Sequence, residues 1–141
     1  MGIEAEILQT CHIVAVVGLS PDPERHSHRV SKYLRDQGYK IVPVNPMATE
    51  VLGEKCYPDL LSIPGPVEVV DIFRRSEDIP SIVDQAIQIK AKAVWMQEGI
   101  VNEDAASRAG QAGIMVVMDR CMLKEHRKLT SQSKENTPSS L

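Results

Sequence analysis

Apolar, strand-like runs alternate with helix-like segments along most of the chain. The runs cover residues 12–17, 40–44, 67–73, 92–96 and 114–118. Short apolar runs that alternate with helical patterns are typical of a parallel sheet covered by helices on both faces. The pattern therefore predicts an α/β fold, a Rossmann-like three-layer sandwich with about five parallel strands.

The segments between these runs carry helix signals. After the third run, the apolar residues at helical spacing are Ile79, Ile82, Val83, Ala86 and Ile87. Pro80 suits the first turn of this helix. Ser27 is the expected N-cap of the helix between the first two runs, and Gly38 marks its expected end. Asn102 is expected to cap an alanine-rich helix that ends at Gly113.

Three segments depart from this alternation. Pro43 cannot donate a hydrogen bond to a strand ladder, so we expect it near the carboxyl end of the second strand. Residues 49–66 contain too many prolines and glycines for a long helix, which predicts an irregular crossover with one short helix near residues 59–61. The polar stretch that follows predicts a domain over residues 1–129 and a disordered tail over residues 130–141.

Composition excludes several classes of function. The chain has 141 residues, of which 43% are apolar and 25% charged, so one ordinary globular domain is expected. A net charge of −3 and an aromatic content of 4% argue against a nucleic-acid partner. No apolar run is long enough to cross a membrane, and acids occupy the positions where a signal peptide carries bases. We therefore expect a cytoplasmic protein with no membrane partner.

The three cysteines are far apart and lack C-x-x-C spacing. They are Cys11, Cys56 and Cys121. An odd number without such spacing predicts buried thiols in a reducing compartment, and neither a disulfide framework nor a zinc site.

The turn after the first strand is the best candidate for a ligand site. Parallel sheets bind ligands outside the carboxyl ends of their strands, where the winding direction reverses, and we expect the first strand at that point. Gly18 allows close backbone approach there, and Ser20 offers a hydroxyl and an amide. The next helix adds free amides and the positive end of its dipole. Basic side chains cluster beside it, namely Arg25, His26, His28 and Arg29. An anionic ligand is therefore predicted at this turn.

The same turn departs from the G-x-G-x-x-G fingerprint of dinucleotide sites. Ser20 replaces the second glycine and Pro23 the third. Dinucleotide sites also need an acid after the second strand to bind a ribose hydroxyl, and this strand ends in Val44, Asn45, Pro46 and Met47. NAD is thereby disfavoured, although the fold alone does not exclude it.

Other strand ends add side chains to the same edge of the sheet. They cover residues 73–75, 97–99 and 119–121. Arg74 and Arg75 are candidates to pair with phosphates, and Phe73 or Ile79 to cover an adenine or pantetheine face. The open alternative for the two arginines is surface ion pairs with the two acids that follow them.

Four segments resemble a known family. They are VVGLSPDPERHSHRVSKYLRDQGYKIVPVNP, LGEKCYPDL, VWMQEGIVNEDAA and MDRCMLKEH. Together they resemble the small stand-alone CoA-binding proteins, which are similar in turn to the amino-terminal CoA-binding domain of the succinyl-CoA synthetase α subunit. This resemblance covers nearly all of the chain before the predicted tail.

The resemblance implies a set of coenzyme contacts. The pyrophosphate turn would consist of Gly18, Leu19, Ser20, Pro21 and Asp22. The residues beside the adenine and ribose would be Val44, Asn45 and Pro46. A third ligand-binding segment would comprise Met96, Gln97 and Glu98. Cys121 would correspond to a cysteine on the side of the pantetheine thiol.

The chain also departs from these relatives. Met47 and Ala48 stand where a lysine commonly contacts the ligand, so the resemblance requires other cations for the phosphates, with Arg25, Arg74 and Arg75 as candidates. The domain that carries the phosphorylated histidine of the synthetases is not expected in this chain, and no histidine matches a catalytic position of the family.

The function expected from the sequence is therefore binding of coenzyme A or a short acyl-CoA at the carboxyl edge of the sheet, without catalysis by this chain. Two alternatives stay open. One is an NAD(P)-binding oxidoreductase, because the same type of sheet holds either ligand. The other is a regulatory adaptor that senses acyl-CoA and signals to a protein partner that the sequence does not identify.

Overall fold

The computed structural model describes residues 2–135, with side chains as far as residue 131. Five strands form one parallel sheet, which confirms the predicted fold class. They are β1 (Ile13–Val17), β2 (Lys40–Val44), β5 (Val69–Ile72), β6 (Ala93–Met96) and β7 (Met115–Val117). Their order across the sheet is β2-β1-β5-β6-β7.

The winding direction of the sheet reverses at β1. The chain passes from β1 to β2 on one side and then crosses back to β5 on the other side of β1. Val17 of β1 pairs with Val44 of β2 and with Ile72 of β5, so three carboxyl ends lie side by side. The first strand is therefore at the switch point, as the sequence predicts.

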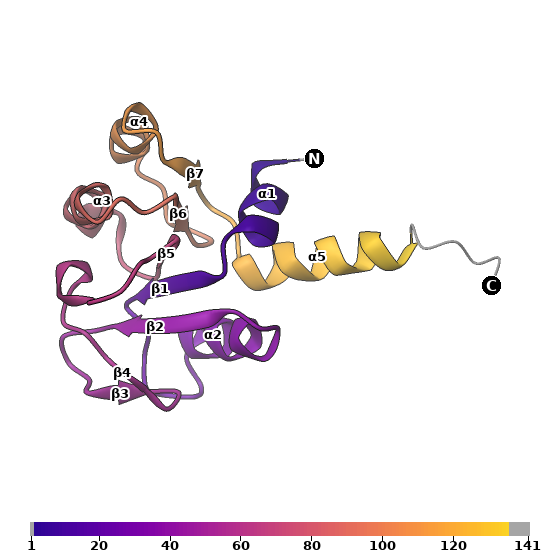
Figure 1. The fold of residues 1–141 in the computed structure, drawn as a ribbon, viewed down its shortest axis with the longest axis horizontal. Coiled ribbons are helices and arrows are strands. Elements are labelled where there is room, and N and C mark those ends of the chain that lie inside the picture. Colours follow the sequence, from indigo (N-terminus) through magenta and orange to yellow (C-terminus); the bar gives the residue numbers. More distant parts are fainter. Residues whose placement is uncertain (1, 136–141) are drawn as a thin grey trace.

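Helices cover both faces of this sheet (Figure 1). They are α1 (Ile3–Thr10), α2 (His26–Asp36), α3 (Ile79–Gln88), α4 (Glu103–Gln111) and α5 (Met122–Glu135). Helices α1, α2 and α5 pack on the face that carries Val14 and Val16, whereas α3 and α4 pack on the face that carries Ala15 and Val17. Because side chains alternate along a strand, β1 contributes to both cores.

Two of the predicted helix starts behave differently in the structure. The Asn102 side chain caps α4 by accepting a hydrogen bond from the Ala105 amide at 3.0 Å, as predicted. The prediction for Ser27 is wrong, because the helix already begins at His26. The Ser27 hydroxyl instead accepts a hydrogen bond from the Ser20 amide at 3.0 Å. It thereby joins the helix to the turn after β1.

The other helix signals are confirmed. The apolar stripe of α3 is buried at Ile79, Ile82, Val83 and Ala86. Pro80 lies in the first turn of α3. Gly38 and Gly113 follow α2 and α4 with φ angles of +100° and +83°, the left-handed conformation that commonly ends a helix. The helices α1 and α5 were not predicted from the sequence.

The crossover between β2 and β5 is irregular. It contains a short hairpin of β3 (Glu50–Val51) and β4 (Glu54–Lys55), followed by the 3-10 helix η1 (Leu60–Ser62). A second 3-10 helix, η2 (Ser76–Asp78), lies outside the crossover and follows β5. The position of η1 confirms the short helix expected near residues 59–61. Pro43 lies next to last in β2, an edge strand that pairs with β1 alone in the sheet, so its missing amide breaks no ladder bond. The hairpin was not predicted.

The carboxyl-terminal boundary differs from the prediction. Helix α5 continues to Glu135, into the segment expected to be a disordered tail. Leu129 of α5 packs against the core. The Thr130 hydroxyl donates a hydrogen bond to the His126 carbonyl at 3.2 Å. These two contacts stabilise the helix at the predicted boundary. The rest of the predicted tail, residues 136–141, lies outside the described residues. Over residues 2–135 no helix is both long and apolar enough to span a bilayer.

Candidate functional site

Gly18 forms the turn that follows β1. Its φ angle is +89°, and its amide donates to the Val44 carbonyl at 2.8 Å. A Cβ atom at this position would lie 2.5 Å from the carbonyl oxygen of Phe73. The sequence analysis assigned this glycine to ligand approach, and the structure adds a steric reason, because the ends of β1 and β5 are too close for any side chain.

Hydrogen bonds hold the rest of the turn in place. The Ser20 hydroxyl accepts from the Asp22 amide at 3.1 Å. The Asn45 side chain donates to the Leu19 carbonyl at 3.0 Å, and its oxygen accepts from the Met47 amide at 2.8 Å. The turns after β1 and β2 therefore form one hydrogen-bonded unit.

Two clefts lie along this edge of the sheet. The first has a volume of about 200 Å³ and lies between the ends of β1, β2 and α3, where it is lined by Gly18, Val44, Asn45, Pro46, Asp59 and Arg74. The second has a volume of about 530 Å³ and is lined by His26, Phe73, Arg74, Arg75, Gln97 and Glu98. Arg74 borders both, so the two clefts are neighbours at the switch point. Nine of the predicted contact residues line one or the other.

The two arginines form the surface ion pairs that the sequence left as an alternative. Arg74 lies 3.3 Å from Asp78, and Arg75 lies 3.4 Å from Glu77. Both guanidinium groups are substantially exposed, and exposed pairs contribute little free energy. These contacts therefore leave both arginines free to exchange their partners for a phosphate at small cost.

Several predicted contact residues do not reach the clefts. Leu19, Ile79 and Met96 are fully buried in the core. Ile79 is the first residue of α3 and packs against the sheet, so the expectation that it covers an adenine or pantetheine face is wrong. Pro21, Asp22 and Arg25 are exposed on the turn and line neither cleft.

A buried carboxyl group lies behind the second cleft. Asp71 of β5 is fully buried, and one of its oxygens accepts from the Gln97 side-chain amide at 2.6 Å. Burial raises the pKa of Asp71 to about 7, against the lowering effect of the Gln97 hydrogen bond. Asp71 was not among the residues predicted for the site, although an acid inside an apolar run is a signal that identifies such a residue.

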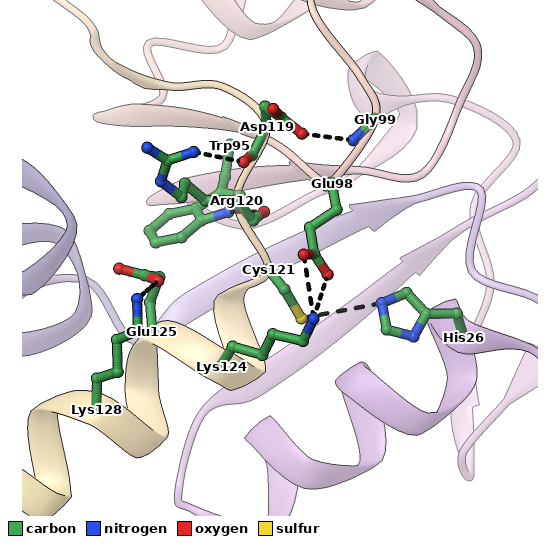
Figure 2. Close-up of polar contacts among 10 residues, drawn as sticks. All are labelled: His26, Trp95, Glu98, Gly99, Asp119, Arg120, Cys121, Lys124, Glu125 and Lys128. Carbon is green, nitrogen blue, oxygen red and sulfur yellow. Dashed lines mark hydrogen bonds and ion pairs between the residues drawn. The ribbon is translucent and has the colours of Figure 1, made fainter.

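The loop before α5 brings Cys121 beside His26 and Glu98, two residues that line the second cleft (Figure 2). Its sulfur lies 3.8 Å from Nε2 of His26, a residue that the sequence analysis named only as part of a basic cluster. Glu98 lies nearby and pairs with Lys124 at 2.9 Å. Burial raises the pKa of the Cys121 thiol, an effect that hydrogen bonds from the amides of Lys124 and Leu123 oppose.

Comparison with known proteins shows which family the chain belongs to. Residues 12–127 match the family described as the CoA binding domain. The chain belongs to this family. The matched segment contains both clefts and Cys121, so the family assignment covers the whole candidate site.

Relatives of this CoA-binding domain occur alone and within larger enzymes. YneT of Bacillus subtilis (strain 168) is 45% identical over 121 residues, which cover 86% of this chain and 90% of that protein. A solved structure of a hypothetical protein from Pyrococcus horikoshii OT3 is 46% identical with a TM-score of 0.87, and the match covers 90% of this chain and 89% of that one. Acetate–CoA ligase [ADP-forming] I of Archaeoglobus fulgidus is 28% identical over 120 residues, which cover 78% of this chain but 18% of the ligase. The resemblance seen in the sequence is thus confirmed.

Proposed function

We propose that this CoA-binding domain binds coenzyme A or a short acyl-CoA across the carboxyl ends of β1, β2 and β5, as a binding module without catalysis of its own. The observation that carries the proposal is the pair of clefts that adjoin at Arg74, beside the Gly18 turn at the switch point. An elongated ligand with an anionic centre fits two clefts that meet at a cation.

The proposed ligand runs from the first cleft to the second. Its adenosine lies against Asn45 and Pro46, and its pyrophosphate lies at the Gly18 turn. The first turn of α2 contains no acid, so its free amides keep their attraction for a phosphate. Arg74 and Arg75 add positive charge at the same place. The pantetheine arm then follows the second cleft towards Glu98.

The proposal of binding without catalysis is supported by the bonding around Cys121. A thiol nucleophile needs a base that a third group orients through its other nitrogen. Among the hydrogen bonds of the described residues, Glu98 pairs with Lys124 and none joins it to His26. The buried thiol with a raised pKa is also weakly nucleophilic.

Calorimetric titration tests the proposal. The purified protein, stripped of bound ligand, is titrated in parallel with CoA, acetyl-CoA, NAD and ATP. We expect saturable binding of the CoA compounds, with NAD and ATP much weaker. Saturable binding of NAD with no response to CoA contradicts the proposal and favours the oxidoreductase alternative.

A variant pair tests the placement of the pyrophosphate. Ser20→Glu places a carboxylate in the turn, and we expect it to weaken CoA binding by about ten-fold or more because like charges in a contact cost several kcal/mol. Ser107→Glu makes the same change at an exposed position of α4 and is expected to leave affinity unchanged. Equal affinity of the two variants rules out this placement.

A further inference from the structure

Three different metal-ligating side chains converge beside the second cleft. The sulfur of Cys121, a ring nitrogen of His26 and a carboxylate oxygen of Glu98 all lie within 4.8 Å of one another. They come from three separate elements, namely the loop before α5, the start of α2 and the end of β6. Their meeting is a product of the fold and is independent of any contact with coenzyme A.

The spacing of these atoms fits a tetrahedral metal centre. With zinc–sulfur and zinc–nitrogen bonds of usual length, the two ligand atoms are about 3.6 Å apart. The Cys121 sulfur and His26 Nε2 are 3.8 Å apart. His26 and Glu98 are exposed, so small rotations of their side chains suffice to close the remaining distances.

The protein holds the thiol and the imidazole in place. Cys121 is 2% exposed and immediately precedes α5. The His26 ring is held edge-on to the Phe73 ring, with a centroid distance of 6.0 Å. This contact orients the imidazole independently of a metal.

The directions of the side chains favour a metal over a catalytic relay. In a relay the carboxylate binds the imidazole nitrogen that faces away from the thiol. In Figure 2, Nε2 of His26 points towards the sulfur of Cys121, and both carboxylate oxygens of Glu98 are directed at the ammonium of Lys124. The Glu98 carboxylate therefore already binds a cation beside the thiol, and among the described residues it makes no hydrogen bond to His26.

We infer that Cys121, His26 and Glu98 bind a late first-row divalent cation, with Zn²⁺ as the best match to one sulfur, one nitrogen and one oxygen ligand. The thiol releases its proton to solvent when the metal binds. His26 and Glu98 line the second cleft, so the fourth coordination position faces that cleft and takes water or a ligand from it. The ammonium of Lys124, now 2.9 Å from Glu98, is displaced.

Cobalt titration of the full-length, chelator-treated, CoA-free protein tests this inference. Co²⁺ bound to a thiolate gives a near-ultraviolet charge-transfer band, and we expect one equivalent to produce it and Zn²⁺ to abolish it. Cys121→Ser should remove the band, whereas Cys11→Ser, which changes another buried thiol, should keep it. Because no CoA is present, the result does not depend on the proposed function.

Substitutions at His26 and Lys124, which are exposed, and at the half-buried His28 make a second test that avoids the buried cysteines. His26→Ala should weaken Co²⁺ binding by more than about ten-fold, since even outer-shell substitutions cost that much, whereas His28→Ala should bind as the unmodified protein does. Lys124→Met removes the competing ammonium and should strengthen binding. The absence of a charge-transfer band, a band that persists in Cys121→Ser, or equal affinity of His26→Ala and His28→Ala would each overturn the assignment.

Discussion

Gly18 and Asp71 are the residues with the tightest local constraints near the clefts. Gly18 combines a left-handed backbone with a carbonyl oxygen where its Cβ would be. Asp71 combines complete burial with a single hydrogen-bond partner, and its second oxygen has none among the described residues. The effect of single substitutions at these positions on the free energy of unfolding therefore tests the packing at the strand ends.

Gly18→Ala is expected to be strongly destabilising. The new methyl group would lie 2.5 Å from the Phe73 carbonyl oxygen, and a left-handed conformation costs roughly an additional 1–2 kcal/mol for a residue with a Cβ. Gly38→Ala is the matched control, because Gly38 has a φ of +100° but no atom within 4 Å of its Cβ position. Urea unfolding should show a clearly larger loss for Gly18→Ala, and equal losses would contradict the steric argument.

Asp71 is expected to make folding stability depend on pH. Its pKa in the folded protein is raised to about 7, above the usual aspartate value near 4 in the unfolded chain, so the folded state binds this proton more tightly. This contribution is complete below about pH 4 and is lost as the pH rises towards 7, at roughly 1.4 kcal/mol for each unit of pKa difference.

The variant Asp71→Asn should remove that decline. Asp71 Oδ2 and Gln97 Oε1 are both acceptors without partners among the described residues. In the variant an amide nitrogen replaces Oδ2 and can donate a hydrogen bond to Gln97 Oε1. Free energies of unfolding, measured across this pH range, should fall with rising pH for the unmodified protein and fall less for the variant. Parallel curves for the two proteins would show that Asp71 does not keep its proton.

At the scale of elements, the Asn102 side chain joins the start of α4 to Ser76 of η2, a residue that lines the second cleft. The Asn102 oxygen caps α4, and its nitrogen donates to the Ser76 carbonyl of η2 at 3.1 Å. One side chain therefore sets the position of α4 relative to the loop that carries Arg74 and Arg75. A helix cap normally contributes about 1 kcal/mol.

Substitutions at Asn102 separate these two contacts. Asn102→Ala should destabilise the protein by about 1–2 kcal/mol, because both hydrogen bonds are lost. Asn102→Asp keeps the capping oxygen and loses only the donor to Ser76, so its loss should be smaller. Thermal unfolding of the two variants measures the difference, and an aspartate variant as unstable as the alanine variant would show that the cap contributes little.

The elements also show which local signals predict structure. Asn102, Pro80 and Gly113 act within one helical turn, and the helices that they delimit were predicted correctly. Ser27 carries an equally good capping signal, but its hydroxyl binds the Ser20 amide from a neighbouring turn. The β3–β4 hairpin was missed because each strand has two residues, too short for an alternating pattern.

At the scale of the molecule, ligand binding and folding are coupled. A ligand that binds only the folded state stabilises it by about 2.7 kcal/mol when its free concentration is one hundred times its Kd. We therefore expect CoA to raise the thermal unfolding midpoint and NAD at the same concentration to leave it unchanged. The Ser20→Glu variant should lose most of the shift caused by CoA, and a shift caused by NAD alone would argue for the dinucleotide alternative.

The sequence by itself determined the five parallel strands with helices α2, α3 and α4 between them, the glycine turn after β1 and the switch point where the clefts lie. Those features depend on residues within a few positions of one another and on general rules of parallel sheets. Only the tertiary structure decided that Ile79 and Met96 are core residues, that Asp71 meets Gln97, and that Cys121 meets His26 from 95 residues away. Such contacts arise from packing between elements that are far apart in the sequence. A local sequence pattern therefore does not predict which side chains meet.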